Sequence, residues 1–333
     1  MDVTIKDVAK KAKVSTATVS RVINGINTVD EKLRERVQET IKELSYKPNN
    51  LARSLKSDVT NTIGVVVSDI SNQFFINVSR QIEKIIRKNG YTMMIASTDS
   101  DIKKEIDIIN MFAGKRVDGM VISPDSNDIA DSIKDISCPM VAIDRKVLKN
   151  ICDSVYVDKE RSTYDIVQYL YAKGHRSIAL VTGPKDLSSN YDRFNGYIKA
   201  HYDCGIKIDN RNIFFGLFTR EFGNSAMAEI MSMENPPTAI ISGSALITVG
   251  LLVRAKTMGI IIPDDVSIIS FGSIDLEELI DCKVTYIDSL QTEIGGIAGE
   301  MIISRINNPS QKIKHQVLIA RIVEGNSVKT ISL

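Results

Sequence analysis

A short stretch near the start of the chain carries side chains suited to hydrogen bonding with DNA. Between Ser15 and Asn24, the apolar residues Val19, Val22 and Ile23 recur at the spacing of one helix face. The opposite face carries small side chains and one arginine: Thr16, Ala17, Ser20 and Arg21. A helix fits the major groove, and the N–H groups of its first turn can bind phosphates. The pattern favours DNA binding over the alternative, a helical module that docks another protein.

Two further helices are expected to hold this segment. The first helix has an apolar stripe at i, i+3, i+4 and i+7, formed by Ile5, Val8, Ala9 and Ala12. Thr4 and Asp7 have the spacing of a capping box, and Ser15 can cap the second helix. A third helix follows Asp30, ends before Tyr46-Lys47-Pro48 and has one apolar face, formed by Leu33, Val37, Ile41 and Leu44. Three short helices of this kind predict a helix-turn-helix domain.

The charge is distributed unevenly along the chain. Residues 1–60 hold 12 Lys and Arg against 8 Asp and Glu, whereas residues 61–333 hold 30 against 33. A small basic unit on a mildly acidic body suggests that the unit alone meets a polyanion. An ordinary solvated charged surface is the alternative that composition leaves open.

Composition narrows the class of protein. The 333 residues are 43% hydrophobic and 25% charged, as in soluble globular proteins. No apolar run approaches a membrane span, and the first residues lack the apolar core of a secretory signal, so we expect a cytoplasmic protein. The four cysteines have no Cys-x-x-Cys spacing, so we expect buried, reduced thiols, no metal and no cofactor: Cys138, Cys152, Cys204 and Cys282.

From residue 62 onward, apolar runs typical of strands alternate with helical patterns. Continuous apolar strands separated by helices indicate parallel sheets covered on both faces, and about 270 residues suit two doubly wound lobes. Ligands of such folds bind beyond the carboxyl ends of strands. We therefore expect a cleft at residues 68–72, 183–184 and 272–273. Phe74 and Phe75 either line it or pack in the core.

Two other classes of protein share this α/β scaffold. The chain lacks a Gly-x-Gly-x-x-Gly turn, a Walker loop and a Gly-x-Ser-x-Gly elbow, and its histidines (His175, His201 and His315) form no catalytic pattern, so we expect no enzyme and no catalytic residue. His175 is expected to be structural. A solute-binding protein would need an export signal and would not need the first sixty residues.

Residues 4–9 (TIKDVA), 14–24 (VSTATVSRVIN) and 46–49 (YKPN) closely resemble the headpiece of LacI/GalR-family bacterial regulators. The resemblance extends along essentially the whole chain and implies that Thr16, Ala17 and Arg21 contact base edges. The full set of DNA-contacting residues that it implies is Thr4, Ser15, Thr16, Ala17, Thr18, Ser20, Arg21, Asn24, Tyr46, Asn49, Ala52, Arg53 and Leu55. Lys13 stands where the family usually has glycine, and a side chain at positive φ costs roughly 1 kcal/mol.

The resemblance also implies a domain plan. Residues 1–48 would be the headpiece, 49–60 a hinge helix and 61–333 an effector-binding and dimerisation domain, with lobes at about 61–160 plus 291–321 and 161–290 plus 322–333. Leu55 would wedge into the minor groove of a pseudo-palindromic operator; a plain linker is the alternative. Since no leucine-heptad tail follows the last strand-like run, Gln316–Val323, we expect a homodimeric regulator, more often a repressor than an activator.

The body resembles a periplasmic sugar-binding protein with an effector between its lobes. The implied effector-binding residues are Asp69, Asn72, Phe74, Arg193, Ser244 and Gly272. The usual Asn-Asp pair is replaced by Ser244-Ala245, and the usual aspartate after an aromatic residue by Gly272, so partners for sugar hydroxyls are missing. We therefore expect an effector other than a neutral sugar: an anionic metabolite held by Arg193, a protein corepressor, or no small ligand.

Overall fold

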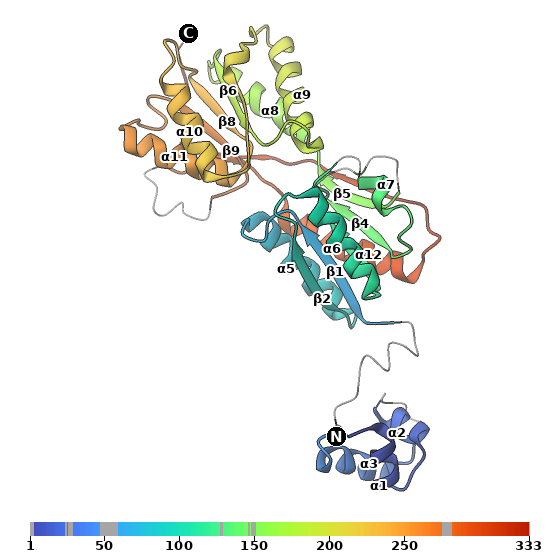
Figure 1. Ribbon diagram of the computed structural model, residues 1–333. Coiled ribbons are helices and arrows are strands. Elements are labelled where there is room, and N and C mark those ends of the chain that lie inside the picture. Colours follow the sequence, from blue (N-terminus) through green and yellow to red (C-terminus); the bar gives the residue numbers. More distant parts are fainter. Residues whose placement is uncertain are drawn as a thin grey trace. The chain divides into compact units, whose positions relative to one another are not determined.

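The structure is a computed structural model in which residues 3–23, 25, 29–46, 59–126, 129–145, 147, 151–274 and 282–332 are described. The chain divides into two compact units, residues 1–60 and residues 61–333. Figure 1 shows the three-helix unit near the N-terminus and the two sheets of the larger unit.

The small unit contains three helices: α1 Ile5–Lys11, α2 Thr16–Ile23 and α3 Glu31–Glu43. Each begins at a capping side chain. The Asp7 carboxylate accepts hydrogen bonds from the Thr4 backbone N–H and hydroxyl, at 2.9 and 2.7 Å. Ser15 Oγ accepts from the N–H of Thr18, and Asp30 accepts from two N–H groups in the first turn of α3. The predicted three-helix arrangement is confirmed.

A small apolar core holds these helices together. Its buried members are Val8, Ala9, Ala12, Val19, Val22, Val29 and Val37. The turn between α1 and α2 passes through Lys13, which has a φ of +54°. The side chain therefore occupies the left-handed backbone region, where glycine is favoured. The expected strain at Lys13 is thus present in the turn that sets α2 against α1.

The larger unit alternates strands and helices. Its strands are β1 Thr62–Val67, β2 Thr92–Ser97, β3 Gly119–Ile122, β4 Met140–Ile143, β5 Asp153–Val157, β6 Ile178–Thr182, β7 Ile213–Phe215, β8 Ala239–Ser242, β9 Ser267–Phe271, β10 Thr285–Ile287, β11 His315–Leu318 and β12 Ile322–Val323. Its helices are α5 Gln73–Lys88, α6 Ile102–Gly114, α7 Ile129–Ile133, α8 Lys159–Ala172, α9 Ser188–Asp203, η1 Asn210–Asn212, α10 Arg220–Met231, α11 Ala245–Met258 and α12 Gln291–Asn307.

The strands form two sheets, one in each lobe. The first has the order β11-β5-β4-β3-β1-β2 and the second β12-β10-β9-β8-β6-β7. Every described pair is parallel except β10 with β12. The predicted pair of doubly wound lobes is confirmed.

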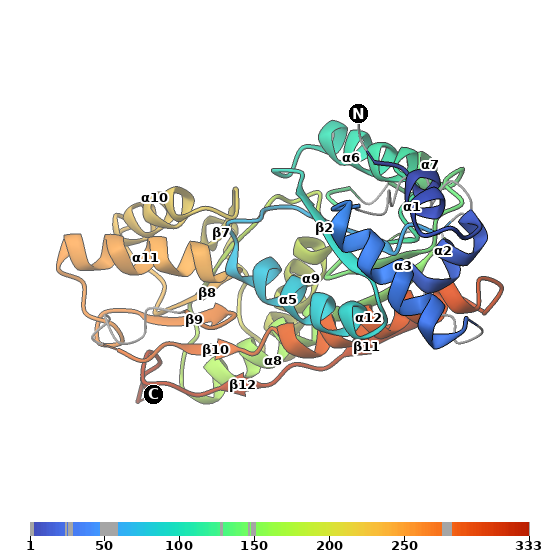
Figure 2. The same cartoon turned by 90° about the horizontal axis from the view of Figure 1, so that it is seen from below.

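Neighbouring residues of one strand face different helical layers, as a doubly wound sheet requires. Val65 packs in the core that includes α5 and α12, whereas Val66 packs in the core that includes α6 and α7. Figure 2 shows α5 and α12 side by side on the first lobe. In the second lobe, α8 and α9 cover one face of the sheet, and α10 and α11 cover the other.

The run Gln316–Val323, which the sequence suggested as one strand, is two strands. β11 pairs with β5 in the first sheet and β12 pairs with β10 in the second. The chain therefore passes from one lobe to the other between Leu318 and Ile322. Periodicity does not reveal this boundary because only three residues, Ile319 to Arg321, separate the two strands.

The predictions for the cysteines and for His175 can also be compared with the structure. All four cysteines are free, but only Cys152 and Cys282 are buried; Cys138 and Cys204 are half-buried, so the expected burial is wrong for these two. His175 is fully buried, with Nδ1 2.9 Å from Thr238 Oγ1 and Nε2 3.2 Å from the Lys329 carbonyl oxygen. These contacts fit a structural histidine.

Candidate functional site

The outward face of α2 presents a continuous set of exposed side chains. Thr16, Ala17 and Arg21 are exposed, while Val19 and Val22 on the opposite face are buried in the small core. This division follows from the helical spacing, which turns residues 16, 17, 20 and 21 away from residues 19, 22 and 23. The apolar face of α2 therefore packs in the small core, and its polar face is exposed to solvent.

Other residues of the predicted DNA-contacting set have defined surroundings. Ser15 and Thr18 join through their hydroxyl oxygens, 2.9 Å apart, so Ser15 serves as a cap as well as an exposed polar group. Ser20 is half-buried, and Tyr46 packs against the small core. Thr4 caps α1 through Asp7. Five predicted residues lie outside the described residues: Asn24, Asn49, Ala52, Arg53 and Leu55.

The larger unit contains a cleft of about 600 Å³ between its lobes. The three loops expected to form the cleft all contribute to it, through Ser68, Asp69, Ser71, Asn72, Pro184, Gly272 and Ser273. Several helices begin at lining residues, as expected where parallel strands end: α5, α8, α9, α10, α11 and α12. All six predicted effector-binding residues line the cleft, namely Asp69, Asn72, Phe74, Arg193, Ser244 and Gly272.

Three of these six use their polar side chains locally. Asn72 accepts a hydrogen bond from the N–H of Phe74 and so caps α5. Ser244 accepts from the N–H of Ile247 and caps α11. Asp69 Oδ1 accepts from the N–H and hydroxyl of Ser71, both at 2.7 Å. Their positions at the cleft therefore have a structural reason.

Arg193 is 6% exposed and is held by its own helix. Its Nη1 donates to Asn190 Oδ1 at 2.9 Å and to the Ser189 carbonyl at 3.2 Å. The guanidinium carbon lies 4.5 Å from the centroid of the Phe271 ring. Burial lowers the pKa of Arg193 to about 10, which still leaves it charged at neutral pH.

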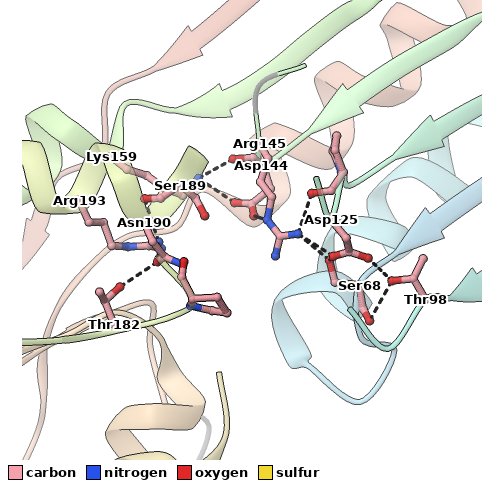
Figure 3. Close-up of polar contacts among 12 residues, drawn as sticks. Ser68, Thr98, Asp125, Asp144, Arg145, Lys159, Thr182, Ser189, Asn190 and Arg193 are labelled. Atoms are coloured by element: carbon pink, nitrogen blue, oxygen red, sulfur yellow. Dashed lines mark hydrogen bonds and ion pairs between the residues drawn. The ribbon is translucent and has the colours of Figure 1, made fainter. Parts of the chain in front are cut away.

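A second buried cation comes from the loop after β4. Arg145, 4% exposed, donates from Nη1 to Asp125 Oδ1 at 2.8 Å, to Ser68 Oγ at 2.9 Å and to the Pro124 carbonyl at 2.7 Å. In Figure 3 its guanidinium lies between Asp144 and Asp125. The loop after β4 thus places an arginine side chain at the cleft.

A third cation, Lys159, comes from the first turn of α8 in the other lobe. Its Nζ donates to Asp144 Oδ1 at 2.9 Å and to the Asp144 carbonyl at 2.5 Å. Burial would raise the pKa of Asp144, but the nearby charges of Lys159, Arg145 and Arg193 outweigh that effect and hold the pKa below its usual value. Burial lowers the pKa of Lys159; the charge and hydrogen bond of Asp144 oppose this effect, and the two arginines add to it. Asp144 is therefore a carboxylate surrounded by three cations.

Behind Arg145 lies a buried polar network in the first lobe. Asp125 accepts from the hydroxyls of Ser68, at 2.5 Å, and Thr98, and its own N–H donates to the Glu105 carboxyl. Burial raises the pKa of Glu105 to about 8, and the negative charge of Asp125 adds to the shift. Glu105 is thus mainly protonated at neutral pH and contributes little charge to the cleft.

The second lobe offers hydroxyl groups at the ends of β8 and β9. Thr248 Oγ1 lies 2.7 Å from Ser242 Oγ and 2.8 Å from Ser270 Oγ. These groups are fully buried, bond to one another and do not line the cleft. The carboxylate expected from family likeness at position 272 is absent, and the described lining residues of the second lobe after β8 and β9 carry no carboxylate.

Asp144, Arg145 and Lys159 are cleft residues that were not predicted from the sequence. Ligand sites follow the carboxyl ends of strands, which is why residues 68–72, 183–184 and 272–273 were predicted. The same rule, applied to the ends of β4 and β5, selects Asp144, Arg145 and Lys159. Charged residues directly after an apolar run were the available signal.

Metal and membrane sites have no candidates in the described ranges. Those residues contain no His, Cys, Asp or Glu group arranged to hold a metal ion. Likewise, no helix among them combines the length and apolarity needed to cross a membrane.

Two family matches cover most of the chain. Residues 4–49 match the bacterial regulatory proteins of the lacI family, and residues 60–323 match the periplasmic binding proteins and sugar-binding domain of the LacI family.

The curated relatives are transcriptional regulators. The chain is 34% identical over 305 residues to the HTH-type transcriptional repressor CytR of Escherichia coli, covering 91% of this chain and 89% of that protein. It is 33% identical over 334 residues to the HTH-type transcriptional repressor PurR of Vibrio atlanticus, covering 99% of both. It is 33% identical over 310 residues to catabolite control protein A of Priestia megaterium, covering 92% and 93%.

Solved structures share the fold. A complex of the transcriptional regulator CelR with cellobiose superimposes with a TM-score of 0.73 at 26% identity, covering 98% of this chain and 99% of that one. The lac repressor dimer bound to operator and the anti-inducer ONPF gives a TM-score of 0.88 at 22% identity, covering 99% and 100%.

These matches agree with the headpiece motifs, the three-helix unit and the two doubly wound lobes. The family consists of regulators, which confirms the expectation of a regulator rather than an enzyme. The chain belongs to the LacI family of bacterial regulatory proteins and is a DNA-binding transcriptional regulator.

Proposed function

We propose that the protein is a repressor that acts in the cytoplasm and binds a pseudo-palindromic operator as a homodimer. Relatives CytR and PurR are repressors by name, and the lac repressor of similar fold is a dimer on its operator. One recognition helix per half-site, about one helical turn of DNA apart, is the geometry that a two-fold dimer requires.

The observation that carries this proposal is the division of α2 into two faces. Arg21 is exposed beside Thr16 and Ala17, whereas Val19 and Val22 are buried. Arginine can donate two hydrogen bonds to guanine in the major groove, and small side chains let the helix approach the bases closely. We assign base contacts to Thr16, Ala17 and Arg21.

Contacts outside the base edges are assigned to residues around α2 and after α3. Backbone phosphates would be met by the polar groups Thr4, Ser15, Thr18, Ser20, Asn24, Tyr46, Asn49 and Arg53. Leu55 and Ala52 would meet the minor groove if residues 49–60 form a hinge helix on DNA. In this plan, residues 1–48 are the headpiece and 61–333 sense the effector and dimerise.

The effector site is proposed to be the cleft between the lobes, with an occupant other than a neutral sugar. A sugar-binding site needs acceptors for several hydroxyls, and unsatisfied hydroxyls cost about 1–3 kcal/mol each. At the second-lobe end of the cleft, the Ser244 hydroxyl oxygen already accepts from the N–H of Ile247, and Gly272 provides no side chain. Effector binding would shift operator affinity by changing the relation between the two lobes.

The test is selection of bound fragments from random duplexes, followed by gel shifts on the selected site. We expect a pseudo-palindromic motif, a complex with two chains per duplex by mass photometry, and an affinity that falls steeply with salt as phosphate contacts release counterions. Recovery of no shared motif, or one chain per site at saturation, would contradict the proposal.

A further inference from the structure

We propose that the cleft binds the phosphate or carboxylate group of a small anionic metabolite through Arg145, Lys159 and Arg193. The inference rests on the proposed effector-controlled function and names the chemical class of the effector.

The three cations come from separate elements and converge on one carboxylate. Arg145 follows β4, Lys159 begins α8, and Arg193 lies within α9. Each is at most 6% exposed, and all three act on the Asp144 charge. Figure 3 shows Asp144 between Lys159 and Arg145. Three buried cations around one cleft carboxylate leave an excess of positive charge that a bound anion would neutralise.

Both arginines of the cleft have an N–H donor, at Nε, that makes no hydrogen bond to a described residue. Among the described residues, Arg145 Nε and Arg193 Nε are buried and have no hydrogen-bond acceptor. Asp144 Oδ2 lies 3.7 Å from Arg145 Nε, which is an ion-pair distance and too long for a hydrogen bond. Buried N–H donors of charged groups are costly when unsatisfied, so an anionic oxygen is the partner that they favour.

Among the described residues, other charges at the cleft cancel this excess only in part. Asp125 pairs with Arg145 at 2.8 Å, so Asp144 and Asp125 offset two of the three cations and leave one positive charge. At the rim, Asp99 pairs with Lys104 and is exposed, and Asp69 is bonded to Ser71. Exposed carboxylates are screened by water and ions, whereas the buried cations are screened much less. Within the described part of the chain, the buried cations therefore attract an anion more strongly than the exposed carboxylates repel it.

The surroundings of the cations suit a metabolite with an apolar part. Phe271 stacks against Arg193, and Phe74, Leu217 and Phe218 also line the cleft. Six helices also begin at lining residues, and each directs the positive end of its dipole there. A ligand would place its charged group against the cations and its body against these side chains.

Asp144 would act as an internal anion that the ligand has to displace. It accepts from Lys159, and a ligand anion would compete for the same Nζ. This arrangement predicts opposite effects for two variants: Lys159→Gln removes a cation from the site, and Asp144→Asn removes the competing charge. Lys199→Gln, on the exposed face of α9, is the control with the same change in charge.

The test is titration of inorganic phosphate into the full chain by isothermal calorimetry, with chloride replacing phosphate at constant ionic strength. We expect Lys159→Gln to weaken binding at least tenfold, Asp144→Asn to tighten it severalfold, and Lys199→Gln to leave it unchanged. Glucose, gluconate and glucose 6-phosphate are titrated next. Tighter binding of gluconate identifies a carboxylate as the preferred group, and tighter binding of glucose 6-phosphate identifies a phosphate.

Several results would overturn the inference. These are no phosphate binding by the unmodified chain, equal binding by all variants, or glucose binding more tightly than both anions. Circular dichroism verifies that each variant is folded, and should Asp144→Asn unfold, the Lys159→Gln and Lys199→Gln pair decides alone. Gel shifts on the selected operator separate the two proposals, because a chain that binds operator and not anions overturns only this inference.

Discussion

Lys159 Nζ lies 2.9 Å from Asp144 Oδ1, which joins the first turn of α8 in the second lobe to the loop after β4 in the first. Both side chains are at least 85% buried. Breaking a buried ion pair leaves an uncompensated charge, whereas removing both partners together does not. The pair is therefore a link between the lobes as well as part of the cleft.

A double-mutant cycle measures this link. We expect Lys159→Gln to destabilise the chain by about 3 kcal/mol because it leaves the buried Asp144 with weaker partners. The double variant, Lys159→Gln with Asp144→Asn, should lose less stability than the two single variants lose in sum. The difference should exceed about 1 kcal/mol. Urea unfolding followed by circular dichroism gives the four values. Additive losses would contradict a direct interaction.

Glu105 predicts a pH dependence of stability. Its pKa is raised from 4.5 to about 8 in the folded chain, so the folded state holds this proton more tightly than the unfolded state. The associated stability is fully present below pH 4.5 and is lost as the pH rises through about 8, at up to about 1.4 kcal/mol per pH unit.

The variant Glu105→Gln isolates this contribution. Between pH 5 and pH 8 its stability should fall less than that of the unmodified chain, and above pH 8 it should be the more stable of the two. Asp107→Asn, on the exposed face of the same helix, is the control and should keep the original slope. Parallel pH profiles for Glu105→Gln and the unmodified chain, measured by urea unfolding, would refute a buried protonated carboxyl.

Two adjacent glycines of α12 predict opposite effects. A Cβ at Gly295 would lie 2.5 Å from the Val78 carbonyl oxygen of α5, whereas a Cβ at Gly296 meets nothing within 4 Å. Gly295→Ala should destabilise the chain by about 1–3 kcal/mol through overpacking. Gly296→Ala should stabilise it by about 0.5–1 kcal/mol because alanine favours helix. Equal changes in the urea midpoint would mean that α5 and α12 do not pack this closely.

Lys13 predicts a stabilising substitution in the headpiece. Its φ of +54° is accessible to glycine without steric cost, so Lys13→Gly should raise the stability of the three-helix unit by about 1 kcal/mol. Lys13→Ala keeps the Cβ and should change stability by only a few tenths. Backbone amide exchange of buried Val8 and Val19 reports the difference, and a gain for alanine as large as that for glycine would argue against backbone strain.

Periodicity predicted the elements of this fold well because each buried strand is a nearly continuous apolar run. β1 and β6 are examples: burial on both faces removes the alternation that an exposed face imposes. The outward face of α2 was equally visible, since Val19 and Val22 fix which side of the helix is buried. Short strands were harder, and the switch of sheets between β11 and β12 depends on long-range pairing that no local pattern encodes.

The charged centre of the cleft was predicted only in part. Arg193 was expected there from family likeness, but Arg145 and Lys159 are separated by 14 positions and sit in different lobes. Their proximity results from the chain crossing between the sheets. Burial of three cations around Asp144 is likewise a tertiary property, because each residue alone is an ordinary surface type in sequence.

The most direct test of the central claim, that the outward face of α2 reads DNA bases, is the operator affinity of Arg21→Ala relative to random duplex, measured by competition gel shift. We expect a loss of about 1–3 kcal/mol on the selected site, roughly 5- to 150-fold in affinity, with little change on random DNA. Arg36→Ala, an exposed arginine of α3, should leave the ratio of the two affinities unchanged. An Arg21→Ala protein with an unaltered preference for the operator over random duplex would contradict the claim.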